Sequence, residues 1–344
     1  MSAVLAGLMP ALAVAAVGAS GATSANGATD SAAGAVTVAS AAVRAEAREI
    51  FAHIVGIESS VGKGQVPAVA DYLASRFKAC GFAAADIHVL PLGETASLVV
   101  RYRGNGNGGR PIDFIAHMDV VTAKRADWQR DPYLLIEENG YFFGRGTSDV
   151  KQEVALLTTT FCTLKVQGFV PTRDLIIAFS GDEETEQATA TDLVTKHREL
   201  VDAEFALNGD GGGGVLSEET GKPLLFYVQG AEKSAEAYLL TTRNPGGHSS
   251  RPRPDNAIYE LADALKAVQH LEFPVMWNDW TRGDFKAAGE VTPGPLGAAM
   301  ARFAADPHDS AAAAEIAKNP AYVGRIRTTC VATMLSGGHA ENAL

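Results

Sequence analysis

Cysteine is scarce in this sequence, and the few cysteines are not spaced like the ligands of a zinc finger or the framework of a disulfide-rich domain. Cys80, Cys162 and Cys330 stand far apart in a chain of 344 residues. Each lies in an apolar pattern, so we expect three buried free thiols. Beyond the N-terminal region, long apolar runs are also absent, and we expect no partner in the membrane.

Basic residues are outnumbered as well. The sequence has 29 Lys and Arg against 40 Asp and Glu, a net charge of -11, and no basic stripe. This composition argues against a nucleic-acid partner. A His-Glu-x-x-His helix is missing, which disfavours a mononuclear zinc protease. The remaining composition, 47% apolar and 20% charged, is that of an ordinary globular chain long enough for two domains.

The N-terminal region has no Lys or Arg before Arg44, so it lacks a basic leader segment. Residues 2–19 are nevertheless small and apolar, which predicts a signal peptide over residues 1–25. A flexible linker rich in Ala, Ser, Thr and Gly follows over residues 26–41. We therefore expect a secreted or periplasmic protein; the alternative is a disordered extension on a cytoplasmic one.

Helical and strand patterns alternate from residue 42 onward. Apolar periodicity predicts helices over residues 44–57 and 67–80, and a third helix directly after Asp149. The apolar runs 112–116 and 175–180 are too short for helices and suit buried parallel strands. We expect an α/β domain over residues 42–229, with a mostly parallel sheet and flanking helices.

The pattern changes after about residue 229. Residues 233–243 and 328–334 alternate as strands, and Asp255 is a good N-cap for a helix that ends at His270. The expected inward face of this helix carries Ile258, Leu261, Leu265 and Val268. We therefore expect a smaller α+β domain over residues 230–344.

Side chains that can bind a metal or transfer a proton follow the expected strand ends or precede the N-terminus of an expected helix. They are His117, Asp119, Asp149, Glu183, Glu184 and Asp210. Ligand sites in open α/β sheets lie outside the carboxyl ends of the strands, so these residues should converge on one edge. One imidazole with several carboxylates suits zinc, and more than one ion of it. Without cations the carboxylates would repel one another and take up protons; a solvated acidic face is the alternative.

Four segments resemble the family of di-zinc metallopeptidases. They are His117-Met118-Asp119, Gly146-Thr147-Ser148-Asp149-Val150-Lys151, Asp182-Glu183-Glu184 and Gly246-Gly247-His248-Ser249-Ser250. The family includes aminoacylase, glutamate carboxypeptidase, acetylornithine deacetylase and succinyl-diaminopimelate desuccinylase, and the resemblance covers about residues 45–344. It implies a zinc exopeptidase-like catalytic domain and a lid domain that forms a homodimer.

The resemblance also implies ligands for two zinc ions in a complete active site. Asp149 would bridge the metals, His117 and Asp210 would complete one ion, and Glu184 would bind the other. Asp119 would orient the His117 imidazole.

Three further roles follow from the same resemblance. Glu183 would be the general base on the metal-bridging water. His248, in the lid, would stabilise the oxyanion in a neighbouring subunit, and Asn342 would contact substrate. Asp182 is expected to be structural, and His339 a surface residue.

The sequence departs from the family pattern at its end. Leu344 falls inside the lid, before the segment in which relatives carry a last zinc-binding His and an Arg for the substrate carboxylate. We therefore expect a C-terminally truncated member. One ion would keep His117, Asp149 and Asp210, whereas the other would keep only Asp149 and Glu184.

The function that the resemblance implies is hydrolysis of an amide or peptide bond by a zinc enzyme. The expected activity is that of a carboxypeptidase, a dipeptidase or an N-acyl-amino-acid amidohydrolase, with a small peptide or N-acyl amino acid as substrate. The alternative is a truncated, catalytically inactive metal-binding protein of the same fold. Metal content and turnover would separate the two.

Overall fold

The computed structural model describes residues 39–217 and 219–344. The predicted signal peptide and nearly all of the predicted linker lie outside these residues. The described chain divides into two compact units, one ending at Asp210 and the other beginning at Gly211. The sequence placed this boundary later, at residues 229–230. Across the described ranges, none of the helices has the length and hydropathy that a membrane span requires.

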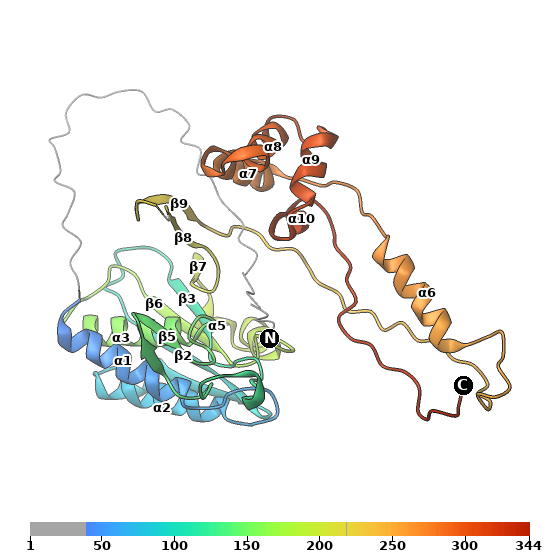
Figure 1. Cartoon of the computed structure of the whole chain (residues 1–344). Helices are drawn as coiled ribbons and strands as arrows, with labels where there is room; N and C mark the ends of the chain where they lie inside the picture. Colours follow the sequence, from blue (N-terminus) through green and yellow to red (C-terminus); the bar gives the residue numbers. More distant parts are fainter. Residues whose placement is uncertain (1–38, 218) are drawn as a thin grey trace. The chain divides into compact units, whose positions relative to one another are not determined.

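The first unit is built on a five-stranded sheet in the order β1-β2-β6-β3-β7 (Figure 1). Its strands are β1 (Ile87–Leu92), β2 (Thr95–Tyr102), β3 (Ile112–His117), β6 (Leu175–Ser180) and β7 (Phe205–Asn208). β3 is parallel to both β6 and β7, while β2 is antiparallel to β1 and to β6. Four strands therefore run one way and β2 alone is reversed, which confirms the predicted mostly parallel sheet.

Helices cover both faces of this sheet (Figure 1). The helices are α1 (Ala41–Val55), α2 (Val66–Ala79), α3 (Lys151–Val166), α4 (Ala188–Lys196) and α5 (Arg198–Val201); short elements are η1 (Ala84–Asp86), η2 (Arg125–Asp127) and the hairpin β4 (Ile136–Glu138) with β5 (Tyr141–Phe143). Side chains alternate along β6: Ile177 and Phe179 pack with α1, α2 and α3, whereas Ile176 and Ala178 pack with Leu193 of α4. The predicted α/β fold with flanking helices is confirmed.

The strand register sets the position of the chemically active residues. His117 pairs with Ser180, so the chain leaves β3 and β6 at the same level. Asn208 of β7 pairs with Ile115, which places Asp210, two residues further on, level with His117. The loops that follow these three parallel strands therefore begin at one edge of the sheet.

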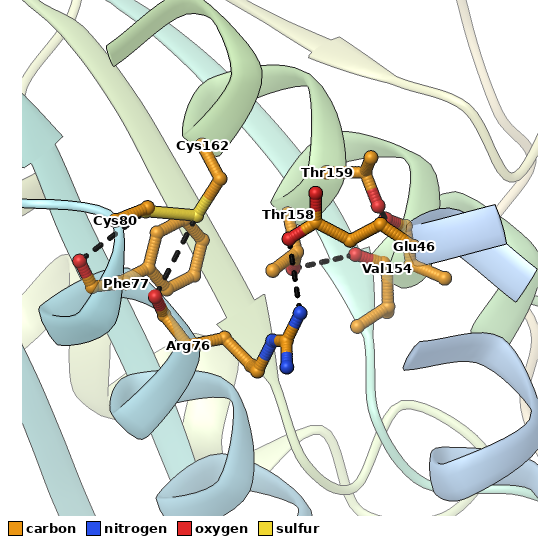
Figure 2. The surroundings of a disulfide bond; sticks show 9 residues. Glu46, Arg76, Phe77, Cys80, Val154, Thr158, Thr159 and Cys162 are labelled. Carbon is orange, nitrogen blue, oxygen red and sulfur yellow. Dashed lines mark hydrogen bonds and ion pairs between the residues drawn. A yellow bond between two sulfur atoms is a disulfide. The ribbon is translucent and has the colours of Figure 1, made fainter. Parts of the chain in front are cut away.

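The expectation of three buried free thiols is wrong. Cys80, at the end of α2, and Cys162, in α3, form a disulfide with a Cα–Cα distance of 5.3 Å (Figure 2). Cys330 is free but exposed. Apolar periodicity predicts burial for α2 and α3 separately, but it does not show that their cysteines face each other. Beside the disulfide, Arg76 of α2 forms an ion pair of 2.9 Å with Glu46 of α1, so the three helices of this layer are linked.

The second unit contains a β-hairpin and helices. They are β8 (Gly213–Leu216), β9 (Pro223–Tyr227), α6 (Ala257–Gln269), α7 (Asp279–Val291), α8 (Gly294–Ala305), α9 (Ser310–Ala317) and α10 (Pro320–Ile326). Helices α7 to α10 share a core of their own, in which the Phe285 and Phe303 rings meet edge to face at 5.6 Å. The sequence analysis did not predict this group of helices.

The two strands predicted in the second unit are wrong. Residues 233–243 and 328–334 form no ladder in the described chain. Alternating apolar residues favour an extended backbone, but a strand also needs a hydrogen-bonded partner, which the alternation does not supply. Helix α6 is present, but its N-cap is Asn256 and none of its residues is buried, so the predicted inward face is not buried.

Candidate metal centre

His117 stands at the centre of the residues that gather at the sheet edge. Its side chain is 1% exposed, and its Nε2 atom faces carboxylates from other loops. Nε2 lies 2.9 Å from Asp149 Oδ1, 3.5 Å from Asp210 Oδ2 and 4.0 Å from Glu183 Oε2. The Asp149 oxygen comes from the loop directly before α3. The other two oxygens come from the loops after β6 and β7, which begin at the same edge of the sheet as His117.

Asp119 connects the His117 segment to the loop after β6. Its carboxylate accepts the backbone N–H groups of Glu183 and Glu184, each at 3.0 Å. On the other side, His117 Nδ1 lies 3.0 Å from the Asp119 carbonyl oxygen and 3.4 Å from its Oδ1. Because both atoms are acceptors, Nδ1 donates a proton to Asp119, which leaves Nε2 as the ring nitrogen that faces the other carboxylates and would bind an ion.

Within residues 39–217 and 219–344, two groups of three residues are close enough to hold an ion. His117, Asp149 and Glu184 form one, and His117, Glu183 and Asp210 form the other, with ligand atoms within 4.8 Å of one another. Both groups use the same imidazole. A single nitrogen lone pair binds one ion, so only one of the two sets can hold an ion through His117 at a time.

The cluster carries an excess of negative charge. Burial alone lowers the pKa of His117, but hydrogen bonds to Asp119, Asp149 and Asp210 raise it to about 12. Burial, and then the charge of Asp149, raises the pKa of Glu184 to about 7. Protons are thus retained where carboxylates crowd together, and a divalent cation neutralises such a site equally well. An imidazole with surrounding carboxylate oxygens is a donor set that fits zinc.

Asp182 is a buried acid whose side chain contacts the start of α4. Its carboxylate accepts the N–H groups of Ala188 at 2.8 Å and Thr189 at 2.9 Å, and also the Thr189 hydroxyl. These groups lie at the start of α4, where free N–H groups need acceptors. Asp182 therefore fixes the first turn of α4.

His248 and Asn342, the predicted lid residues, belong to the second unit. A β-bridge joins His248 to Ala343, and Ser249 N donates to Asn342 O at 3.0 Å. The imidazole Nδ1 of His248 accepts the Ser250 N–H at 3.2 Å. The structure thus brings the two predicted lid segments together, although they are far apart in the sequence.

Two buried polar residues near the cluster were not identified from the sequence. Ser59 Oγ donates to Met118 O at 2.7 Å, and Lys151 Nζ donates to Ile54 O at 2.7 Å and to Ile57 O at 2.8 Å. The sequence feature that could have drawn attention to Lys151 is its position at the end of the family-like motif of residues 146–151. Ser59 gives no local signal, because its partner is 59 residues away.

A helix-flanked α/β sheet with an imidazole and several carboxylates at one edge defines a class of candidate metallohydrolases. Residues 114–339 match the model of the peptidase family M20/M25/M40, so the chain belongs to this family. The resemblance expected from the sequence is thereby confirmed.

Curated relatives match about half of the chain. It is 26% identical over 190 residues to the N-fatty-acyl-amino acid synthase/hydrolase PM20D1 of Homo sapiens, covering 55% of this chain and 38% of that protein. It is 32% identical to the probable carboxypeptidase S-like 2 of Dictyostelium discoideum, covering 51% and 34%. A probable succinyl-diaminopimelate desuccinylase of Staphylococcus aureus is 30% identical, with 55% and 43% covered. The chain thus spans less than half the length of these relatives.

Two solved structures each match about half of the chain. Human carnosine dipeptidase 1 matches with a TM-score of 0.42 and 20% identity, covering 51% of this chain and 42% of that one. An M20 family metallo-carboxypeptidase from Sulfolobus solfataricus matches with a TM-score of 0.44 and 18% identity, covering 51% and 38%.

Proposed function

We propose that this protein is a zinc-dependent hydrolase that cleaves an amide or peptide bond, with a small peptide or an N-acyl amino acid as substrate. The observation that carries this proposal is the contact of His117 Nε2 with carboxylates from three different loops. Family membership supports it, as do relatives named as an acyl-amino acid hydrolase, a carboxypeptidase and a desuccinylase. The substrate class comes from those relatives.

Four residues would hold the metal: His117, Asp149, Asp210 and Glu184. Bound zinc at such a site lowers the pKa of water and polarises a carbonyl group. The chain's own contribution is to orient the ligands. Asp119 accepts a hydrogen bond from His117 Nδ1–H, which keeps Nε2 directed at the carboxylates.

Glu183 is the proposed general base. Its side chain is 42% exposed, and its Oε2 lies 4.0 Å from His117 Nε2, so it borders the cluster and still reaches solvent. Burial raises the pKa of Glu183, which brings it closer to neutral pH. Its carboxylate would take a proton from the attacking water and pass it to the leaving amine. The backbone of Glu183 is held by Asp119, so the base is fixed against the imidazole.

We assign roles to His248 and Asn342 by the same reasoning. In this proposal His248 stabilises the oxyanion and Asn342 contacts substrate, both from the lid of a homodimer. The β-bridge between His248 and Ala343 supports a common role, because it holds the two segments together. Exposed apolar side chains in the second unit support self-association. They include Tyr238, Leu239, Ile258, Val331 and Met334.

We propose that the protein works outside the cytoplasm. The Cys80–Cys162 disulfide supports this location, because disulfides persist mainly in oxidising compartments. The apolar segment at residues 2–19 is consistent with export through a signal peptide.

The test of the proposed function is the Glu183→Gln variant, assayed with a panel of dipeptides and N-acyl amino acids. Removing the base should lower turnover by ~10²-fold or more while zinc content stays near that of the wild type. Glu186→Gln is the matched control, since Glu186 is an exposed acid in the same loop. Loss of zinc with Glu183→Gln would show that Glu183 and Glu184 exchange roles. A wild-type protein that binds zinc but turns over none of these substrates would contradict the proposed hydrolase activity. That result would favour the alternative of an inactive metal-binding protein.

A further inference from the structure

Lys151 is a fully buried lysine beside the metal centre, and the proposed reaction does not use it. Its side chain is 0% exposed, although it stands only two residues after Asp149. Nζ donates to Ile54 O at 2.7 Å and to Ile57 O at 2.8 Å. Ile54 lies in the last turn of α1, so the amino group binds carbonyls at the end of that helix.

The aliphatic part of the Lys151 side chain packs against the loop that leads to Asp149. Lys151 N donates to Gly146 O at 3.0 Å. A Cβ atom on Gly146 would come within 3.0 Å of both Lys151 Cδ and Val120 Cγ1, and the φ angle there is +86°. Only glycine fits this position without displacing its neighbours. Gly146, three residues before Asp149, is therefore held close between Lys151 and Val120.

Residues 54–59, which accept the hydrogen bonds of Lys151, also form hydrogen bonds with the residues that follow His117. Ser59 Oγ donates to Met118 O at 2.7 Å, and Val120 N donates to Ser59 O at 3.2 Å. Residues 54–59 thus contact residues 118–120 directly and the Asp149 loop through Lys151. The loop that carries the proposed ligand Asp149 and the loop that directly follows the proposed ligand His117 are thus both attached to residues 54–59.

The energetic argument favours a specific role for this amino group. Burying a polar group costs free energy unless it is hydrogen-bonded, and methionine would fill the same volume without that cost. What Lys151 provides beyond methionine is the pair of hydrogen bonds to Ile54 and Ile57. Those bonds connect two segments whose separation determines where Asp149 stands relative to His117.

We propose that Lys151 is a positioning residue of the metal centre: its two hydrogen bonds to the end of α1 hold the Asp149 loop at the distance from His117 that a shared ion requires. The inference rests on the proposed function, since it concerns the same ion. Groups that orient metal ligands typically contribute 10–100-fold to metal affinity.

The experiment compares zinc affinity in Lys151→Met, Lys165→Met and the wild type, by competition with a chelator at a temperature where all three are folded. Lys165 lies on the same helix, and its amino group sits over the Phe82 and Tyr102 rings. Lys151→Met should bind zinc about 10–100-fold more weakly, and Lys165→Met should match the wild type. Lys151→Arg, which keeps N–H donors, should recover part of the affinity.

The outcomes separate the two proposals. A wild type that binds no zinc contradicts the metal centre, and this inference with it. Unchanged zinc affinity in Lys151→Met, even with a lower melting temperature, contradicts only the role of Lys151 and leaves it a structural residue.

A measurement on the wild type covers the case in which Lys151→Met does not fold. Ile57 N and Ser59 N donate to the same carbonyls, Ile54 O and Ile57 O, that accept the Lys151 bonds. Zinc at about ten times its Kd should slow hydrogen exchange of these two amides by up to about tenfold. The amide of Phe169, beyond the other end of α3, is the control. No slowing at Ile57 and Ser59 beyond that at Phe169 overturns the proposal.

Discussion

Asp113 is a carboxylate buried in the middle of β3, outside the metal cluster. It is 6% exposed, and its Oδ1 has no hydrogen-bond partner among the described residues. Burial raises the pKa of Asp113 to about 7, although Arg101 acts in the opposite direction. The folded protein therefore favours the protonated form, whereas an unfolded chain ionises this group near pH 4. The stability that Asp113 contributes is complete below about pH 4 and is lost as the pH rises through about 7.

Asp113→Asn should consequently stabilise the protein in a pH-dependent way. At pH 8 the variant avoids a buried charge and should gain up to about 4 kcal/mol over the wild type, but at pH 5 much less. Urea unfolding at both pH values measures the difference. Asp71→Asn, an exposed position on α2, is the control. An equal effect of Asp113→Asn at pH 5 and pH 8 would contradict the pKa assignment.

The residues of the metal cluster could be predicted from the sequence where a general rule of α/β sheets gives their place in the fold. His117, Glu183 and Asp210 were expected together because each follows a strand of a parallel sheet, and the register confirms that their strands end at one edge. Their chemical roles stay predictions. The hydrogen-bond partners of Lys151 and Ser59 could not be predicted, since they depend on how the end of α1 packs against the loops.

The disulfide is the strongest covalent constraint between elements. It joins α2 to α3 across a sequence separation of 82 residues. In the chain-entropy model a loop of this length contributes about 4.5 kcal/mol by restricting the unfolded chain. The double variant Cys80→Ala/Cys162→Ala should therefore lower the free energy of unfolding by roughly that amount.

Urea unfolding with and without reductant measures this contribution. Cys330→Ser is the control, because Cys330 is free and exposed. Three reactive thiols in the unreduced, denatured protein would show that the bond does not form. In that case the prediction of free thiols would be correct for Cys80 and Cys162.

Elements were predictable in the first unit because their signals are local. Helices α1 and α2 begin within a few residues of the predicted starts, and Pro67 sits in the first turn of α2, where proline is favoured. The second unit was harder. Residues 233–243 are apolar at alternate positions, but this alternation does not show which other strand, if any, would pair with them. Helices α7 to α10 contain much alanine and glycine, which weakens the amphipathic pattern.

Self-association is the expected behaviour of the whole molecule. The second unit exposes Leu239 at 92% and Ile258 at 55%, among other apolar side chains. Water contact with such a surface is unfavourable, so a homodimer that covers it should form. Ile258→Glu should shift sedimentation toward the monomer. Leu156→Glu, an equally exposed position on α3, should not. A wild type that is monomeric at high micromolar concentration would contradict the dimer.

The central claim is that His117 and its surrounding carboxylates form a zinc site. Metal analysis of the purified protein after zinc loading and exhaustive dialysis tests it most directly. Because the two possible ligand sets share His117 Nε2, we predict one tightly held zinc per chain and a second that is lost on dialysis. Asp149→Asn should lose the tight ion, and Asp71→Asn should keep it. A wild type that retains no zinc, or an Asp149→Asn variant that retains as much as the wild type, would contradict the account.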